Sequence, residues 1–288
     1  MTVKNVKYDD GTLPIREFKL EWMVSNPSIC MIAKRGAGKS WVVRSILKHF
    51  QDIPGGTIIA PTDKMNCFYG KFFPEVYIHY EYKSEIIEKI LYRQQFIIHK
   101  SREKEKEGKK VDPRVFLIMD DCLSSKGSWM RDEPIMQLFF DGRHYQIMYI
   151  LTMQFPLGIK PELRCNFDYI FLLSEDFYSN QKRLHEHYAG MFPTFGSFRQ
   201  IFMDLTNDYG SMVIVNRGSR KSFLDKVFYF KANREVIDKI GCDQFNEFNN
   251  NNYNPNWRFK NKPFDINKFM ETKKKDRITV TRITDNKK

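Results

Sequence analysis

The feature that most constrains the fold is the loop AKRGAGKS at residues 33–40, which fits the phosphate-loop pattern with Ala33 in place of the usual first glycine. The apolar run SICMI at residues 28–32 precedes it and predicts a buried strand. Residues 43–50 follow it, and their apolar side chains are spaced as on the buried stripe of a helix. Because such a loop between a strand and a helix binds phosphate, the sequence predicts a nucleotide-binding α/β protein.

The loop offers three kinds of phosphate ligand. Its backbone N–H groups at residues 36–38 can surround an anion, and two glycines there allow positive φ angles. The ammonium of Lys39 is expected to reach the β- and γ-phosphates, and the hydroxyl of Ser40 to bind Mg²⁺. The residues expected to bind the nucleotide, ATP, are Ala33, Lys34, Arg35, Gly36, Ala37, Gly38, Lys39, Ser40 and Trp41.

A second element of the nucleotide site is the run VFLIMDD at residues 115–121, which matches a Walker B strand. Asp120 is expected to hold Mg²⁺ through its water shell, and Asp121 to polarise the attacking water. Two like charges at the end of a buried strand are costly unless a cation or a reaction requires them. The pair therefore predicts the metal and water half of the same site.

Three further side chains are candidates for catalysis. Gln154 ends the strand after Walker B, so it is expected at the same sheet edge, where an amide can sense the γ-phosphate and orient water. Arg143 lies 11 residues before Gln154 and is a candidate arginine finger for a neighbouring subunit. Arg164 is a second candidate for a finger or a DNA contact, with a turn arginine bonded to nearby carbonyls as the alternative.

The remaining chain predicts strands that alternate with helices, and hence a mainly parallel sheet flanked by helices. One helix is expected over residues 84–100 with Ser84 as its N-cap, and another ends near Gly142. Two late apolar runs, SMVIVNR and KVFYFKA, predict an antiparallel hairpin. Further strands are expected at residues 55–62, 75–82, 147–154 and 167–173.

Two segments stand apart from this pattern. Residues 100–114 form a charged stretch that is expected to be a surface insertion. Residues 246–257 are rich in asparagine and predict a linker. The expected division is thus an ATPase domain at residues 1–245 and a basic, flexible tail at residues 246–288.

The basic charge of the chain is unevenly distributed. The formal net charge is +12, of which residues 255–288 carry +7 and residues 100–114 carry +3. Such clusters suit a polyanion such as DNA, and they equally suit solubility. Five scattered cysteines without a CxxC pair indicate reduced thiols and no zinc site. No apolar run reaches the length of a membrane span, and the N-terminus has no signal-peptide pattern.

These motifs together resemble the FtsK–HerA superfamily of DNA-pumping ATPases. More narrowly, the stretches APTDKMNCFYGKFFPEVYIHYEY, LIMDDCL, GRHYQIMYILTMQFPLGIKPELRCNFDYIFLL and VIVNRGS are similar to genome-packaging ATPases of poxviruses and other nucleo-cytoplasmic large DNA viruses, a group with members in virophages. The similarity covers residues 31–232. Many superfamily members have Asp-Glu where this chain has Asp120 and Asp121, so the shorter side chain of Asp121 must still reach the water.

The resemblance implies a RecA-like core that binds ATP and Mg²⁺ and assembles into a homo-oligomeric ring. It implies that Arg143 acts in trans and that the ring moves double-stranded DNA into a capsid, with a capsid or portal-vertex protein as partner. The expected location is the viral factory in the host-cell cytoplasm, or the virion. The turn at residues 216–222 and the basic tail are candidate DNA contacts.

Two other functions remain open from the residues alone. A small-molecule P-loop kinase normally has an arginine-rich lid and an acceptor pocket, and the sequence contains neither pattern. A nucleotide-binding regulatory protein with little hydrolysis would not need Lys39, Asp120, Asp121 and Gln154 together. A DNA-translocating ATPase accounts for all four residues.

Overall fold

The computed structural model describes residues 2–8, 11–122, 128–219, 222–233 and 236–256. Its contacts divide the chain after Asn251, and the fold below is that of the unit Met1–Asn251. The predicted basic tail lies outside the described residues from residue 257 onward, and so does part of the candidate DNA turn at residues 220–221. The sequence-based domain boundary therefore stays a prediction.

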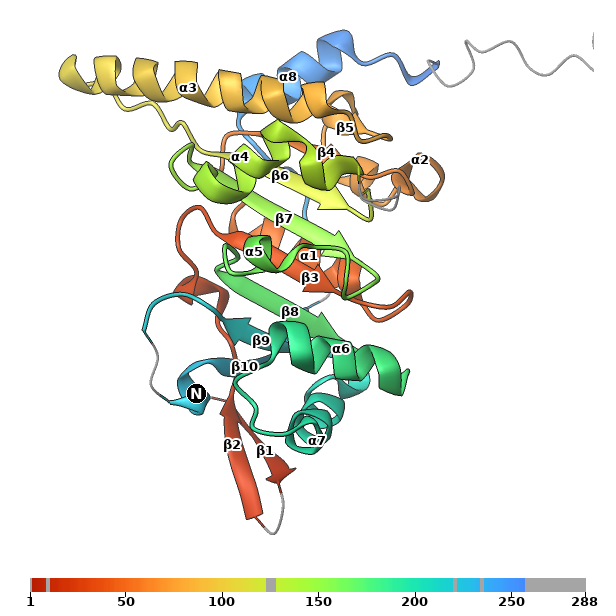
Figure 1. Cartoon of the computed structure of the whole chain (residues 1–288). Coiled ribbons are helices and arrows are strands. Elements are labelled where there is room, and N and C mark those ends of the chain that lie inside the picture. Colours follow the sequence, from red (N-terminus) through yellow and green to blue (C-terminus); the bar gives the residue numbers. More distant parts are fainter. Residues whose placement is uncertain (1, 9–10, 123–127, 220–221, 234–235, 257–288) are drawn as a thin grey trace, which may run out of the picture. The chain divides into compact units, whose positions relative to one another are not determined.

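An eight-stranded sheet forms the centre of this unit, in the order β10-β9-β8-β3-β7-β6-β4-β5 (Figure 1). The six strands from β8 to β5 pair in parallel, and β9 and β10 are antiparallel, as the late hairpin predicted. The fold class is thus confirmed. The strands are β3 (Ser28–Ile32), β4 (Gly56–Ile59), β5 (Ile78–His79), β6 (Val115–Asp120), β7 (Ile147–Met153), β8 (Tyr169–Leu173), β9 (Gly210–Val215) and β10 (Val227–Lys231).

Helices cover both faces of the sheet because the strands are apolar on both sides. On β6, Leu117 and Met119 pack into one hydrophobic cluster, and Phe116 and Ile118 into the other. Figure 1 shows α4 and α6 in front of the sheet and α1 behind it. The helices are α1 (Lys39–His49), α2 (Asp63–Asn66), α3 (Ser84–Lys106), α4 (Glu133–Asp141), α5 (Pro161–Arg164), α6 (Tyr178–Tyr188), α7 (Phe195–Leu205) and α8 (Asp243–Asn252).

An N-terminal hairpin, β1 (Val3–Tyr8) and β2 (Gly11–Arg16), forms a separate two-stranded sheet that the sequence analysis did not anticipate. Buried Val6 and Ile15 pack into the same cluster as α7, and Lys4 pairs with Asp204 at 2.9 Å. Within the described residues no helix is long and apolar enough to cross a membrane. All five cysteines lie in the described residues, and none of them forms a disulfide bond.

The sequence-based prediction was wrong at both ends of helix α3. The N-cap position belongs to Lys83, because the Ser84 hydroxyl donates to Asp132 Oδ1 at 2.6 Å instead of closing its own helix. Residues 100–106, predicted to begin a surface insertion, are the last two turns of the helix. The helix continues there because its charged side chains are good helix formers that need no buried face.

The predictions for residues 75–82 and 246–257 were wrong in part. The first segment is a 3₁₀ turn, Glu75–Tyr77, followed by the two-residue strand β5. The second begins as helix α8, in which Phe245 stacks on Tyr77 with ring centroids 4.2 Å apart. Asparagine has a low helix propensity, but the tertiary packing at the start of this helix outweighs that preference.

Candidate functional site

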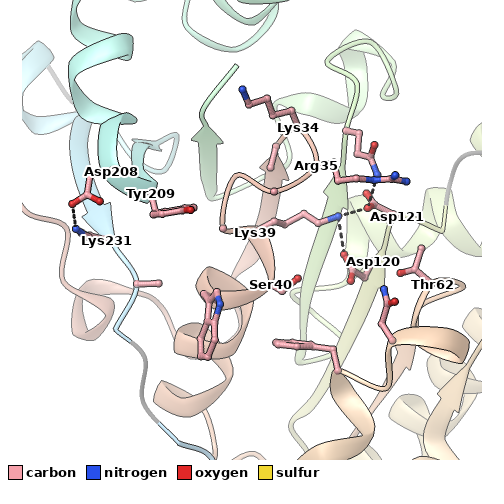
Figure 2. Close-up of a pocket in the computed structure, with 18 of the residues that line it drawn as sticks. Lys34, Arg35, Lys39, Ser40, Thr62, Asp120, Asp121, Asp208, Tyr209 and Lys231 are labelled. Carbon is pink, nitrogen blue, oxygen red and sulfur yellow. Dashed lines mark hydrogen bonds and ion pairs between the residues drawn. The ribbon is translucent and has the colours of Figure 1, made fainter. Parts of the chain in front are cut away.

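A cavity of about 1110 Å³ opens at the carboxyl ends of the parallel strands (Figure 2). Ligands of open α/β sheets bind at this edge. The phosphate loop, the end of β6, the segment after β4 and the turn before β9 all contribute to it. The lining residues are Ala33, Lys34, Arg35, Gly36, Gly38, Lys39, Ser40, Trp41, Thr62, Asn66, Phe68, Asp120, Asp121, Gln154, Asp208, Tyr209, Lys231, Ala232 and Asn233.

The phosphate loop has the backbone that the sequence predicted. Gly36 and Gly38 have φ angles of +79° and +93°, in the left-handed region that other residues rarely adopt. Helix α1 begins directly after Gly38, so its first N–H groups and its positive dipole end face the cavity. Eight of the nine residues predicted to bind nucleotide line this cavity, whereas Ala37 is buried and packs into the core instead.

Lys39 joins the two carboxylates at the end of β6. Its ammonium lies 3.1 Å from Asp120 Oδ1 and also donates to Asp121 Oδ2 (Figure 2). All three side chains are largely buried, with exposed fractions of 13%, 8% and 16%. An ammonium has three donors, so one can still point at a phosphate oxygen while two remain on the carboxylates. The two motifs therefore lie together at one cavity.

Two buried hydroxyl groups hold Asp120 in place. Thr152 on β7 donates to Asp120 Oδ1 at 2.5 Å, and Tyr69 donates to Oδ2 at 3.0 Å. Burial, and then the charge of Asp120, raise the pKa of Tyr69 well above its usual value, so the phenol remains a donor. Asp63, itself buried, accepts the backbone N–H groups of Phe68 and Tyr69 at 2.6 and 2.9 Å, which fixes the tyrosine.

Asp121 occupies an unusual backbone position beside the predicted amide. Its φ angle is +48°, and its N–H donates to Thr152 Oγ1 at 3.2 Å. Gln154 Nε2 donates to Asp121 Oδ2 at 3.0 Å, so β6 and β7 bring the two side chains together as expected. Asp121 Oδ1 is buried and accepts no hydrogen bond from the described residues. This oxygen therefore has acceptor capacity that no described donor uses.

The residues present fit a phosphate-bound Mg²⁺ ion. The Ser40 hydroxyl and the Asp120 carboxylate line the same cavity, and hard oxygen ligands of this kind suit Mg²⁺. In the described part of the chain no group of three or more His, Cys, Asp or Glu side chains could hold a metal. A Mg²⁺ ion that is bound with a nucleotide needs only one or two protein oxygens, because phosphate and water supply the others.

The two arginine candidates lie elsewhere. Arg143 is exposed on the turn before β7, whereas Gln154 follows the far end of that strand. Seven residues of strand separate the two positions by on the order of 20 Å, so Arg143 does not reach the cavity of its own chain. Arg164 donates to the Ile159 carbonyl at 2.9 Å and lies over the ring of Tyr188, which matches the structural alternative for this residue.

Several lining residues escaped the sequence analysis. Thr62 and Asn66 follow β4, and the rule that strand ends meet at one edge could have found them. Asp208 and Tyr209 precede an antiparallel strand, and Lys231 ends another, so no motif points to them. Lys34, which was predicted, forms an ion pair with Asp176.

Comparisons with known proteins give both relatives and a shared fold. No family model matches the chain. An uncharacterized protein of Acanthamoeba polyphaga mimivirus, L437, is 49% identical over 243 residues, which are 84% of this chain and 85% of that protein. Uncharacterized protein 088R of Invertebrate iridescent virus 3 is 32% identical over 253 residues, 82% of this chain and 93% of that protein.

Two solved structures share the fold at low sequence identity. The genome packaging NTPase B204 from Sulfolobus turreted icosahedral virus 2, in complex with AMPPCP, has a TM-score of 0.50 and 13% identity over 73% of this chain and all of that one. The pCW3 conjugation coupling protein TcpA, with ATPγS, has a TM-score of 0.53 and 12% identity over 87% of this chain and 68% of that one.

The fold and the joined Walker motifs are those of a P-loop NTPase. The chain belongs to the family of the mimivirus and iridescent virus proteins, a family of nucleo-cytoplasmic large DNA viruses.

Proposed function

We propose that this protein is an ATP-driven translocase of double-stranded DNA that packages a viral genome into its capsid. The observation that carries the proposal is the arrangement of Lys39, Asp120, Asp121 and Gln154 around one cavity at the carboxyl edge of the parallel sheet. The fold of a viral genome packaging NTPase and the large DNA viruses of the relatives support the same function.

Three residues bind the substrate ATP in this proposal. Lys39 directs its third donor to the β- and γ-phosphates, while the first N–H groups of α1 surround the phosphate oxygens. Ser40 and Asp120 would hold Mg²⁺, with Asp120 acting through the water shell of the ion. Bound Mg²⁺ would neutralise negative charge on the phosphates.

Hydrolysis is assigned to Asp121 and Gln154. The Asp121 carboxylate accepts a proton from the attacking water, and the Gln154 amide orients that water. The hydrogen bond between these side chains keeps both groups on the γ-phosphate side of the cavity.

Arg143 completes the site from a neighbouring subunit. Its exposure and its distance from the cavity of its own chain agree with a role in trans. A guanidinium that enters from the next subunit stabilises charge on the transferred phosphoryl group. This arrangement requires a homo-oligomeric ring in which ATP turns over at the interfaces.

DNA moves through the ring on contacts with its phosphates, without a preferred sequence. The net charge of +12 supports such contacts. The proposed protein partner is a capsid or portal-vertex protein. The proposed location is the viral factory in the host cytoplasm, with the virion as the alternative.

The test is steady-state ATP hydrolysis with and without long double-stranded DNA over a series of salt concentrations, with Lys39→Ala as the inactive control. We expect DNA to stimulate turnover strongly and the stimulation to fade as salt rises. Robust hydrolysis that ignores DNA would contradict the translocase and leave an ATPase with another partner. Phosphate transfer to a small acceptor would favour the kinase.

A further inference from the structure

One end of the cavity is not used by the phosphate chemistry. Beyond the phosphate loop it is lined by Trp41, Tyr209, Ala232 and Asn233. Figure 2 shows Tyr209 on one side of Lys39, with Asp120 and Asp121 on the other side. A ligand bound by its phosphates at Lys39 therefore has room to extend past Tyr209.

Tyr209 lies against the phosphate loop itself. Its Cδ1 atom is 3.4 Å from the point where a side chain at Gly38 would begin. Even so, the tyrosine is 61% exposed, because its ring borders the cavity and not the core. A large aromatic side chain that is exposed beside an anion site has an uncovered face for a planar ligand.

The turn that holds Tyr209 is strained. Asp208 and Tyr209 have φ angles of +50° and +59°, which residues other than glycine rarely adopt, and they follow one another. An ion pair between Asp208 and Lys231 ties the turn to the end of β10. Gly210 follows these two residues, and a side chain there would not fit, since its Cβ atom would lie 2.2 Å from the Leu205 carbonyl oxygen. The surrounding structure thus fixes the tyrosine in place.

Trp41 also lines this end of the cavity. Trp41 is 37% exposed, and the guanidinium of Arg44 lies 5.3 Å from its ring centroid and 5.1 Å from that of Phe72. Asn233 is anchored to α1, because its carbonyl accepts the Ser45 hydroxyl at 3.3 Å. These contacts limit the motion of the groups around this end of the cavity.

We propose that Tyr209, with Trp41, forms a nucleobase subsite, on which the base of a nucleoside triphosphate stacks while its phosphates lie in the loop. The inference rests on the proposed function, since it needs a phosphate-binding loop. Stacking of a base on an aromatic ring adds affinity that an inorganic phosphate chain cannot gain. The strained turn then has a function, namely to place the ring beside the loop.

The test compares two ligands, ATP and inorganic tripolyphosphate, each with Mg²⁺, by titration calorimetry. The proteins are wild type, Tyr209→Ala, Tyr209→Phe and Lys39→Ala, and Tyr92→Ala is the matched control because Tyr92 is 74% exposed on α3, away from the cavity. Tyr209→Ala is expected to weaken ATP binding by about 5- to 30-fold and to leave tripolyphosphate binding unchanged. Tyr209→Phe and Tyr92→Ala should bind both ligands as wild type does.

The outcomes separate the subsite from the proposed function. Wild type that binds tripolyphosphate as tightly as ATP, or Tyr209→Ala that loses neither or both ligands equally, would overturn the subsite and leave the phosphate loop intact. Wild type that binds neither ligand would overturn the proposed function and the subsite with it. Lys39→Ala should lose both ligands, which identifies the loop as the shared anchor.

Discussion

The two ends of the cavity are built in opposite ways. At the phosphate end, Lys39, Asp120 and Asp121 are largely buried and are held by hydroxyl and amide groups from neighbouring strands. At the other end, Tyr209 is exposed and is held by a strained turn and by one surface ion pair. The comparison indicates that charge placement requires a buried network, whereas a stacking surface requires only a fixed backbone.

Of the variants that test this comparison, Lys39→Ala is expected to have the largest effect. The change removes the cation that pairs with both Asp120 and Asp121, and it removes the donor to the phosphates. We expect ATP hydrolysis to fall by about 10³-fold or more and ATP binding to weaken. Turnover and calorimetry would check this, with Lys48→Ala on the same helix as control. Normal ATP turnover by the Lys39→Ala variant would contradict the proposed role of the phosphate end in hydrolysis.

The next variant asks whether the phosphate end is complete in one chain. Arg143→Ala should bind ATP normally and hydrolyse it on the order of 10³-fold more slowly, because the charge on the transferred group loses its partner. Exposed Arg102 supplies the control, Arg102→Ala. Mixing Arg143→Ala with Lys39→Ala chains should restore part of the activity, since mixed interfaces regain an intact site. No rescue at any mixing ratio would refute action in trans.

A smaller effect is expected inside the buried network. Tyr69→Phe removes one donor from Asp120 and leaves its oxygen without that partner, so the free energy of unfolding should drop by about 1 kcal/mol. The Mg²⁺ concentration needed for half-maximal hydrolysis should rise, because Asp120 is less fixed. Tyr82→Phe removes a hydroxyl bound to Asp132 outside the cavity and should change stability alone. Equal Mg²⁺ dependence in the two variants would make Tyr69 merely structural.

The smallest effect belongs to the exposed pair at the other end. Asp208→Ala loosens the Tyr209 turn and should weaken ATP binding by about 2- to 3-fold, without affecting tripolyphosphate. Lys231 lowers the pKa of Asp208 below its ordinary 3.8, so the wild-type Asp208–Lys231 pair is charged above pH 4. The ion pair would be lost only as the pH falls through that lowered pKa. The effect of the variant should thus be the same at pH 6 and pH 8. Asp243→Ala, which breaks a similar exposed pair with Lys239, is the control.

Sequence patterns located the phosphate end because its parts are local. A phosphate loop needs its glycines, lysine and serine in one run between a strand and a helix, and β6 and β7 end in polar residues after apolar runs. Parallel strands then bring Lys39, Asp121 and Gln154 to one edge without further information. The same logic, applied to β4, would have included Thr62 and Asn66.

Other features depended on contacts between distant residues. Ser84 has the residue type of an N-cap, yet its hydroxyl bonds to Asp132, and the asparagine-rich α8 is helical where Phe245 meets Tyr77. The sequence by itself determined the class of fold and the chemistry of the phosphate site, since periodicity and motif spacing are encoded along the chain. Only the tertiary structure decided that Tyr209 borders the cavity, because a turn beside an antiparallel strand gains its position from packing across the sheet.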